Sequence, residues 1–522
     1  QASAMAAFRI PPAPAGQQGQ GMLDWAAATA LWASPKVDFF SPSVAPLQGF
    51  GARARERISA GERLLQIPLK ACLTPLVLPD APAFVDEQQK LMLSLLREVL
   101  VHGKTSSWQP YFQSLPRDFS TLPLWFSHAE VRMLQGTSMD TLLQGAHIAN
   151  PQDLETIAHW CSAAGGPGQQ LFPAGTAPTV EELRWAASVV ASRSFESAEV
   201  GVALVPFADA LNHSGSMPHT RMHDCGNHLV FHAEREINPG EEVLNCYGEH
   251  GNIQWLLNGG FVEDSNPFDE LPLTPAEAVS AAMAYLRGRC EGKQDAPAMS
   301  KDTQASQDLR SEDSEDEDWE STMCSRLAVL QMAGIYSDDA FQIRGEDLLP
   351  DALVTLLLVL CMDCEEFATY QQRDEEHAII DLTTEELSEK LRRDLCESLL
   401  RVVDFVEQRY ETSLEEDMAL LAKLEAFLEE ADSTGMCQKR PKGDAVAHAG
   451  SARGDFLALL HSDVRPQNLQ NILRLRIGQK AILRNLRERV QECFQEDQSA
   501  SEPEEDTLPE KLPAGAGFNE KK

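Results

Sequence analysis

The residues best suited to chemistry lie within residues 193–261. There, an Asn212-His213 pair and a lone tyrosine, Tyr247, each follow a short apolar run. Upstream, Gly49-Phe50-Gly51 brackets an aromatic residue with glycines, which allow a backbone to approach a ligand closely. Taken singly, the glycine pair favours a plain hairpin turn and Tyr247 an ordinary core tyrosine. Together, these segments predict a site with a floor of backbone and a few directed side chains.

The elements that must position these residues are short strands mixed with helices. Apolar runs between turn residues predict a hairpin near residues 49–68 and strands at residues 202–207, 229–233 and 243–247. Helical spacing predicts helices at residues 24–32, 84–101 and 252–257. The polar cap and acidic turn of Thr179-Val180-Glu181-Glu182 predict a helix start. No dinucleotide fingerprint follows a strand, so we expect a β-rich mixed domain and no doubly wound sheet.

At 522 residues, the chain exceeds the size at which one core stops growing. A run dense in Asp, Glu and Ser cannot bury enough apolar surface to fold. We expect a flexible lead-in (1–21), a first domain (22–270) with a helical insertion (about 85–160), a connecting helix (271–290), an acidic disordered insertion (291–324), an all-α domain (325–494) with a disordered spacer (about 431–454), and an acidic disordered tail (495–522).

The net charge of −36 at pH 7 argues against a basic nucleic-acid-binding surface and against an anionic membrane face. A substrate that carries Lys or Arg would be attracted instead. The 11 cysteines are scattered and odd in number, which indicates reduced thiols in an intracellular compartment. No apolar run reaches the length of a membrane span. The sequence leaves open whether that compartment is the chloroplast, the cytoplasm or the nucleus.

A histidine-rich stretch raises the question of a metal. Its spacings are irregular and it crosses a Gly/Pro-containing loop, whereas metal sites need ligands that converge from a fixed scaffold. The Cys361-Met362-Asp363-Cys364 motif ends an apolar helical run and predicts two core thiols. We therefore expect no metal site. The stretch comprises His213, His219, His223, Cys225, His228 and His232.

Five segments, in their order and spacing, resemble SET-domain methyltransferases, and more narrowly the RuBisCO large-subunit lysine methyltransferase-like group. The resemblance implies an α+β fold, in which a β-rich SET domain with a helical insertion is followed by an all-α substrate-binding domain. Two further segments, residues 410–417 and 473–483, match the C-terminal half of that group. The five segments are Gly49-x-Gly51, Arg193-x-Phe195, Asp209-x-x-Asn212-His213-Ser214, Gly240-Glu241-Glu242 through Tyr247-Gly248, and Gly260-Phe261.

The same resemblance implies S-adenosylmethionine as the cofactor. The backbone of Gly49-Phe50-Gly51 would meet its methionine end. Asn212 and His213 would hold the adenine, mainly through backbone groups, and Phe261 would flank it. Arg193 would lie beside the cofactor and the substrate channel.

Tyr247 is implied as the catalytic residue, with its hydroxyl at the point of methyl transfer. Arg193, Asp209 and Tyr247 are implied as substrate-binding residues. A lysine amine, with a reference pKa of about 10.4, is a nucleophile only when neutral. An apolar channel beside a positive sulfonium would disfavour the ammonium form. The reaction then depends on alignment and on oxygens directed at the methyl group, and requires no metal.

The chain departs from the group at three positions. Gln48 stands where relatives often carry an acid, Ser197 replaces an arginine, and Gly259 occupies the place of a tyrosine that lines the lysine channel. We expect a monomeric protein-lysine N-methyltransferase that acts on a histone or non-histone protein. The alternatives are a protein-histidine methyltransferase of the same fold and a catalytically silent SET-like module that binds a protein. The protein substrate and the number of methyl groups added stay open.

Overall fold

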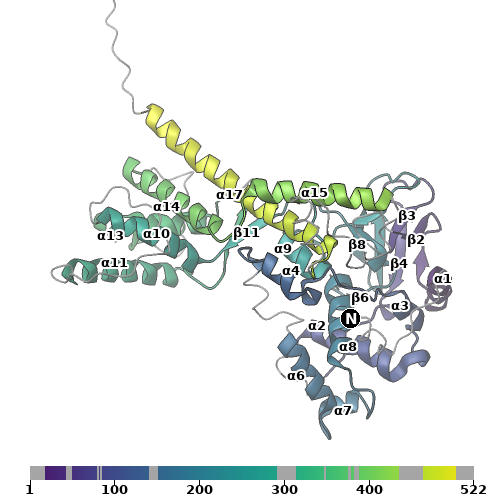
Figure 1. Ribbon diagram of the computed structural model, residues 1–522. Coiled ribbons are helices and arrows are strands. Elements are labelled where there is room, and N and C mark those ends of the chain that lie inside the picture. The colour runs from purple at the N-terminus through teal and green to yellow at the C-terminus, as the bar shows by residue number, and fades with distance from the viewer. Residues whose placement is uncertain are drawn as a thin grey trace, which may run out of the picture. The chain divides into compact units, whose positions relative to one another are not determined.

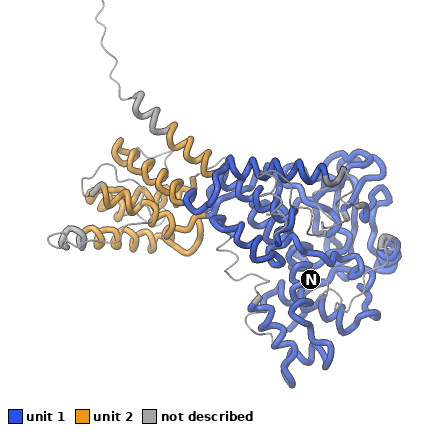
Figure 2. The backbone as a smooth tube through the Cα atoms, in the orientation of Figure 1, with its two compact units in different colours: residues 1–272, 342–348, 406–482 blue, residues 273–341, 349–405, 483–522 orange. Residues whose placement is uncertain are grey.

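A computed structural model describes residues 18–42, 50–78, 82, 85–139, 151–290, 313–345, 349–373, 378–380, 387–433 and 463–500. The chain divides into two compact units (Figure 2). Unit 1 combines residues 1–272, 342–348 and 406–482, and unit 2 combines residues 273–341, 349–405 and 483–522. The candidate residues above all fall in unit 1, together with segments from much later in the chain.

Unit 1 contains a six-stranded sheet in the order β1-β4-β9-β8-β10-β7. Two of its strands, β4 and β8, are labelled in Figure 1. Strand β10 runs parallel to β7 and β8, whereas the other neighbours are antiparallel. The parallel register sets Leu244 opposite Asn212 and Asn245 opposite His213. It therefore brings together two predicted strand ends that are separated along the chain. The strands are β1 (Trp32–Ala33), β4 (Arg63–Pro68), β7 (Asn212–His213), β8 (Thr220–Asp224), β9 (His228–Ala233) and β10 (Leu244–Asn245).

Two smaller sheets complete the β structure near the site. Strand β2 (Val37–Pro42) pairs antiparallel with β3 (Phe50–Ala54), and β5 (Ser194–Ser197) pairs with β6 (Gly201–Leu204). The glycine-bearing β3 also bonds to the segment just before β10. Its Ala52 carbonyl accepts from the Val243 N–H at 2.7 Å.

Helices surround these sheets in unit 1. Trp255 and Asp209 lie on short helical turns, η7 (Trp255–Gly259) and η6 (Ala208–Ala210). The α-helices with residues in unit 1 are α1 (Gln18–Thr29), α2 (Glu87–Arg97), α3 (Gln109–Ser114), α4 (His128–Met133), α6 (Pro151–Ser162), α7 (Pro167–Leu171), α8 (Val180–Arg193), α9 (Asn252–Gln254), α15 (Leu414–Ser433) and the first part of α17 (Pro466–Ala500).

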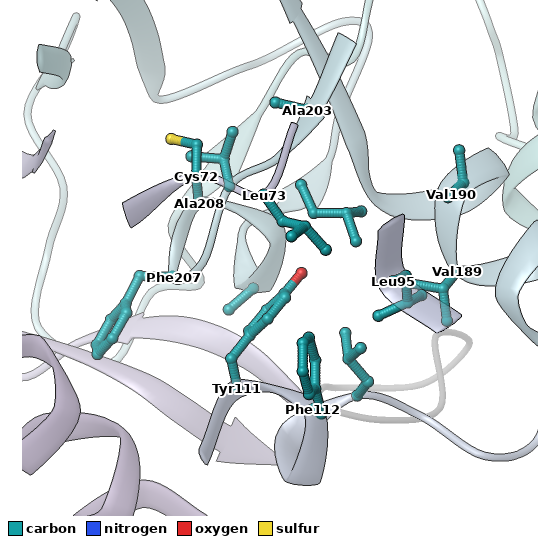
Figure 3. Close-up of a cluster of buried hydrophobic side chains, with 14 of the residues drawn as sticks. Cys72, Leu73, Leu95, Tyr111, Phe112, Val189, Val190, Ala203, Phe207 and Ala208 are labelled. Atoms are coloured by element: carbon teal, nitrogen blue, oxygen red, sulfur yellow. The ribbon is translucent and has the colours of Figure 1, made fainter. Parts of the chain in front are cut away.

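Helix α8 leads directly into the site. Its N-terminus carries a capping box in which the Thr179 hydroxyl accepts from the Glu182 N–H at 3.2 Å. Val189 and Val190 on α8 belong to the same buried cluster as Leu95 of α2 and Phe112 of α3 (Figure 3). Because this packing fixes the rotation of α8, it also fixes the direction in which its last residues project.

Unit 2 is built mainly from α10 (Pro275–Cys290), α11 (Asp313–Met332), α12 (Asp351–Cys361), α13 (Cys364–Tyr370) and α14 (Glu389–Glu407). Helix α12 is apolar and buried along most of its length. The buried Arg326 of α11 donates to the carbonyls of Val359, Leu360 and Met362. These bonds satisfy carbonyls at the end of α12 that have no partner within the helix.

The predicted fold class is confirmed, and several boundaries differ from expectation. The helix predicted at residues 24–32 ends at Thr29, because Ala30 adopts a φ of +61°, a left-handed conformation that does not continue an α-helix. Helix α11 begins inside the span predicted to be disordered, and α17 continues past residue 495 to Ala500. A strand, β12 (Phe341–Arg344), pairs with β11 (Glu270–Leu273) inside a span predicted to be all helical.

Two further observations concern the division of the chain into units and the possibility of a membrane span. Residues 406–482, predicted to belong to the separate helical domain, fall in unit 1 with the sheet. Over the described ranges, no helix combines the length and the apolar character needed to cross a membrane.

Candidate active site

Tyr247 is attached to the His213 strand end by its own backbone. The Tyr247 N–H donates to His213 Nδ1 at 3.1 Å, and the Ser214 N–H donates to the Asn245 carbonyl at 2.9 Å. The Tyr247 hydroxyl donates to the Leu211 carbonyl at 2.7 Å, while the residue keeps 36% of its surface exposed. Burial of the hydroxyl end raises the pKa of Tyr247 above its ordinary value. The phenol therefore stays neutral at physiological pH.

An aromatic cluster packs around His213. Its ring centroid lies 4.3 Å from that of Trp255 and 5.0 Å from that of Tyr247. Phe261 stacks on Trp255 with an interplanar angle of 11° and a centroid separation of 5.8 Å. The imidazole is therefore held by rings from three segments of the chain.

Glu263 lies beside the other nitrogen of the imidazole. Because His213 Nδ1 accepts a backbone N–H, the proton of the neutral ring must lie on Nε2. That nitrogen is 3.6 Å from Glu263 Oε2, and Glu263 Oε1 accepts the Gly215 N–H at 2.9 Å. Burial alone would raise the pKa of Glu263, but His213 and the backbone N–H groups of Gly215 and Ser216 outweigh it and lower that pKa.

Gly51 lies against the side chains of Asn212 and Glu242. Asn212 Nδ2 donates to Glu242 Oε1 at 2.6 Å. A Cβ atom at position 51 would lie 2.5 Å from that oxygen and 2.9 Å from the Asn212 nitrogen. Real Cβ atoms do not approach so closely. With these two side chains in their present positions, residue 51 has no room for a Cβ atom.

Arg193 and Asp209 form a buried polar group with Tyr111. Arg193 Nη1 donates to the Asp209 carbonyl at 2.8 Å and lies 3.4 Å from its carboxylate. The Tyr111 hydroxyl donates to the same carboxylate at 3.0 Å. Burial raises the pKa of Asp209 in spite of these partners. The carbonyl and the carboxylate of Asp209 together hold the Arg193 guanidinium in one position.

A cavity of about 570 Å³ opens beside Tyr247. Arg193, Asp209, Asn258 and Gly259 are among the residues that line it. Tyr247 contributes its ring to this lining, whereas its N–H bonds to His213. The tyrosine thus joins the cavity to the aromatic cluster around the imidazole.

The structure brings most of the predicted site residues together. His213, Tyr247 and Phe261 share the aromatic cluster, Gly51 and Asn212 are in contact, and Arg193 and Asp209 share the cavity wall with Tyr247. Gly49 lies outside the described residues, and Phe50 is described in its strand but not in its side chain.

Two positions that depart from the expected pattern have structural explanations. Gly259 has no room for a side chain in the present arrangement, because a Cβ atom there would lie 2.4 Å from the Phe261 ring. Ser197 is buried at the end of β5, where its hydroxyl accepts the Val200 N–H at 3.3 Å. Neither residue reaches the polar contacts that hold Tyr247.

Sequence reasoning missed four residues that shape the site. Trp255, Glu263 and Tyr111 contact predicted residues from distant positions along the chain, and Glu242 was noted only as part of a motif. A Trp in a predicted helix and a Glu after an apolar run carry no signal of what they contact. Only the Glu242 position, within a glycine-acid turn just before the Tyr247 strand, offered a local clue.

Three histidines of the histidine-rich stretch contact other residues of the sheet. His219 is 4% exposed, and its Nδ1 accepts the Leu244 N–H at 3.1 Å. His223 and His232 face each other across β8 and β9 with ring centroids 5.4 Å apart. In the part of the chain that the structure describes, no group of three or more His, Cys, Asp or Glu residues is arranged to hold a metal ion.

Two family models match the chain. Residues 49–248 match the SET domain, and residues 319–483 match the Rubisco LSMT substrate-binding domain. The chain combines a SET domain with a Rubisco LSMT substrate-binding domain. The predicted family is thereby confirmed. Trp255, Phe261 and Glu263 follow the matched part of the SET domain but belong to the same compact unit.

Relatives and solved structures resemble both parts. N-lysine methyltransferase SETD6 of Rattus norvegicus is 27% identical over 464 residues, which cover 81% of this chain and 89% of the relative. Actin-histidine N-methyltransferase of Homo sapiens is 29% identical over 245 residues, which cover 43% of this chain and 40% of the relative. A crystal structure of the SET domain of LSMT, bound to lysine and AdoHcy, covers 93% of this chain and is itself covered to 94%, with a TM-score of 0.59 and 17% identity. At that identity, the likeness concerns the fold alone.

Two buried donor groups of residues that line the cavity lack a hydrogen-bond partner among the described residues. Trp255 is 5% exposed, and its indole Nε1 has no hydrogen-bond partner among the described residues. Arg193 Nε is likewise buried and without a partner within the described ranges. Unsatisfied buried donors are uncommon in folded proteins. Together with the close approach of Gly51, they are what a pocket for a polar small molecule would show.

Proposed function

We propose that this chain is an S-adenosylmethionine-dependent protein-lysine N-methyltransferase. One observation carries the proposal: Tyr247, whose backbone N–H bonds to His213 and whose hydroxyl bonds to the Leu211 carbonyl, also lines a cavity of about 570 Å³. Such a position is what methyl transfer between two molecules in separate pockets requires. The family models and the SETD6 likeness over 81% of the chain support the same function.

The cofactor would bind on the side of β3 and β7. The backbone of Gly49-Phe50-Gly51 would hold its methionine end, Asn212 and His213 its adenine, and Phe261 the adenine face. Arg193 would lie between the cofactor and the cavity. When bound, S-adenosylmethionine supplies an electrophilic methyl group on a positively charged sulfonium.

Tyr247 would act through its oxygen and not as a base. Its proton is committed to the Leu211 carbonyl at 2.7 Å, so the oxygen lone pairs remain available to the reacting methyl group. Its raised pKa keeps the hydroxyl protonated. Fixed dipoles of this kind stabilise developing positive charge without having to reorganise. Arg193, Asp209 and Tyr247 would contact the substrate, with Asp209 holding the arginine in place.

The acceptor lysine must reach the cavity as a neutral amine. Phe195, Met222 and Trp255 contribute apolar surface to the cavity wall, and a partly desolvated wall disfavours the ammonium form. The partner is thus a protein that presents a lysine to a monomeric enzyme. Eight of the cysteines are free thiols in the structure, which supports a reducing intracellular compartment.

A protein-histidine methyltransferase is the second candidate. The relatives named actin-histidine N-methyltransferase are slightly more identical, at 29%, but the match covers only 43% of this chain. The relatives named lysine methyltransferase match 81% of it. The wider match favours lysine as the acceptor.

Calorimetry with S-adenosylmethionine and transfer of labelled methyl groups into a cell lysate test the proposal. We expect saturable cofactor binding and labelled protein, with mass spectrometry locating the methyl group on lysine. Label on histidine would select the second candidate. Cofactor binding without any transfer would instead support a silent protein-binding module.

A further inference from the structure

The wall of the cavity contains more acidic than basic side chains, so ion pairs within the wall leave a net negative charge. It carries four carboxylates and two guanidinium groups. This excess differs from the large negative charge of the whole chain, because it is concentrated where a substrate would bind. The charged residues that line the cavity are Arg193, Glu196, Asp209, Arg221, Glu234 and Glu249.

Both guanidinium groups already have acidic partners within the wall. Arg193 lies 3.4 Å from the Asp209 carboxylate. Arg221 Nε lies 2.7 Å from Glu234 Oε1. These pairings leave the remaining two carboxylates without a cationic partner at the cavity.

Those two carboxylates are Glu196 on β5 and Glu249 in the segment after β10. Both are solvent-exposed, and neither forms an ion pair with any described residue. Glu196, Tyr247 and Glu249 all line the same cavity. A peptide whose acceptor side chain reaches Tyr247 would therefore pass close to uncompensated negative charge.

We infer that Glu196 and Glu249 select substrates in which the acceptor lysine is flanked by arginine or lysine. The inference rests on the proposed function and specifies its substrate class. The side chain of the acceptor would contact the apolar part of the wall, at Phe195, Met222 and Trp255. The flanking cations would meet the two free carboxylates at the rim, where solvent-exposed pairs form without complete desolvation.

The expected preference is moderate, because exposed ion pairs are weak and screened by salt. Each carboxylate should contribute about a 2- to 5-fold change in kcat/KM. If the two effects multiply, they should give a preference of about 4- to 25-fold for a basic-flanked peptide at low salt. This preference should shrink as the ionic strength rises.

Three peptides with a single lysine test the inference. They differ only in the residues that flank the lysine, which are arginine, serine or glutamate. Each peptide therefore offers one lysine side chain as methyl acceptor. Initial rates of methyl transfer give kcat/KM for the unmodified enzyme and for Glu196→Gln/Glu249→Gln. The control, Glu56→Gln/Glu155→Gln, changes the net charge equally at exposed residues outside the cavity wall.

We expect the arginine-flanked peptide to be preferred, the preference to fall in Glu196→Gln/Glu249→Gln, and the control to keep it. Equal rates for the three peptides, or a preference that survives the double substitution, would overturn the inference and leave the lysine methyltransferase in place. Failure to methylate any of these peptides and any lysate protein would count against the proposed function and the inference together.

Discussion

Replacing Tyr247 by phenylalanine removes one oxygen from the proposed methyl-transfer point. In the fold, the substitution costs a single hydrogen bond, from the hydroxyl to the Leu211 carbonyl at 2.7 Å. The net contribution of such a bond to stability is about 1 kcal/mol. The ring itself would keep its contact with His213, so the strand ends should remain in place.

The effect on catalysis should be much larger than the effect on stability. Loss of one preorganised group at a reacting centre costs about 10²- to 10³-fold in kcat. We therefore expect Tyr247→Phe to lower kcat by about that factor, while the dissociation constant for S-adenosylmethionine stays within about 3-fold, since the oxygen contacts the transferring methyl group mainly in the transition state.

The matched control is Tyr410→Phe. The Tyr410 hydroxyl also makes one buried hydrogen bond, to Gln479 Oε1 at 2.8 Å, and Tyr410 does not line the cavity. Its loss should lower stability by a similar amount and leave kcat unchanged. Methyl transfer, calorimetry and thermal unfolding would be measured on both variants. A Tyr247→Phe enzyme that keeps kcat within about 3-fold of the unmodified protein would refute the role given to the phenol.

Three further outcomes are expected. Gly51→Ala should weaken cofactor binding by about 10-fold or more in calorimetry, because its Cβ atom would lie 2.5 Å from Glu242 Oε1; if Glu242→Ala in the same chain recovers nothing, the clash is not the cause. Glu263→Gln should lower the unfolding temperature relative to the unmodified protein at pH 7, and the two unfolding temperatures should converge in acid. The lowered pKa of Glu263 gives a stabilisation that is complete above the ordinary value of 4.5 and is lost as the pH falls through the folded value, so parallel pH curves would contradict this account. Glu130→Ala should cost about 3 kcal/mol in urea unfolding, since it leaves Arg465 without the fully buried carboxylate 2.8 Å away; a loss below about 1 kcal/mol would mean that the pair does not stabilise the fold.

Local patterns in the sequence predicted the helices that carry their own start signals. The Thr179 cap and its acidic turn predicted the start of α8, which begins at Val180. The apolar run before residue 361 predicted α12, which spans Asp351–Cys361. Both signals act within a few residues of each other, so no knowledge of distant segments is needed to recognise them.

The end of the first helix and the short β10 could not be foreseen in the same way. Residues 24–32 have helical spacing, yet Trp32 pairs with Gln66 in β1 and β4. Residues 243–247 look like one strand, yet the ladder with β7 and β8 comprises Leu244 and Asn245, whereas Val243 bonds to Ala52 of β3. In both cases, the partner strand decides the outcome, and its position is not written in the local pattern.

The sequence by itself determined the family, the cofactor class and most of the residues of the candidate site, because their motifs occur in a fixed order along the chain. The tertiary structure alone decided that Trp255 and Glu263 lie against His213 and that two carboxylates in the cavity wall have no ion pair with the described residues. It also decided that residues 406–482 fold with the sheet. Motifs report which residues are present, whereas contacts between segments far apart depend on how strands and helices pack, and packing is a property of the whole folded unit.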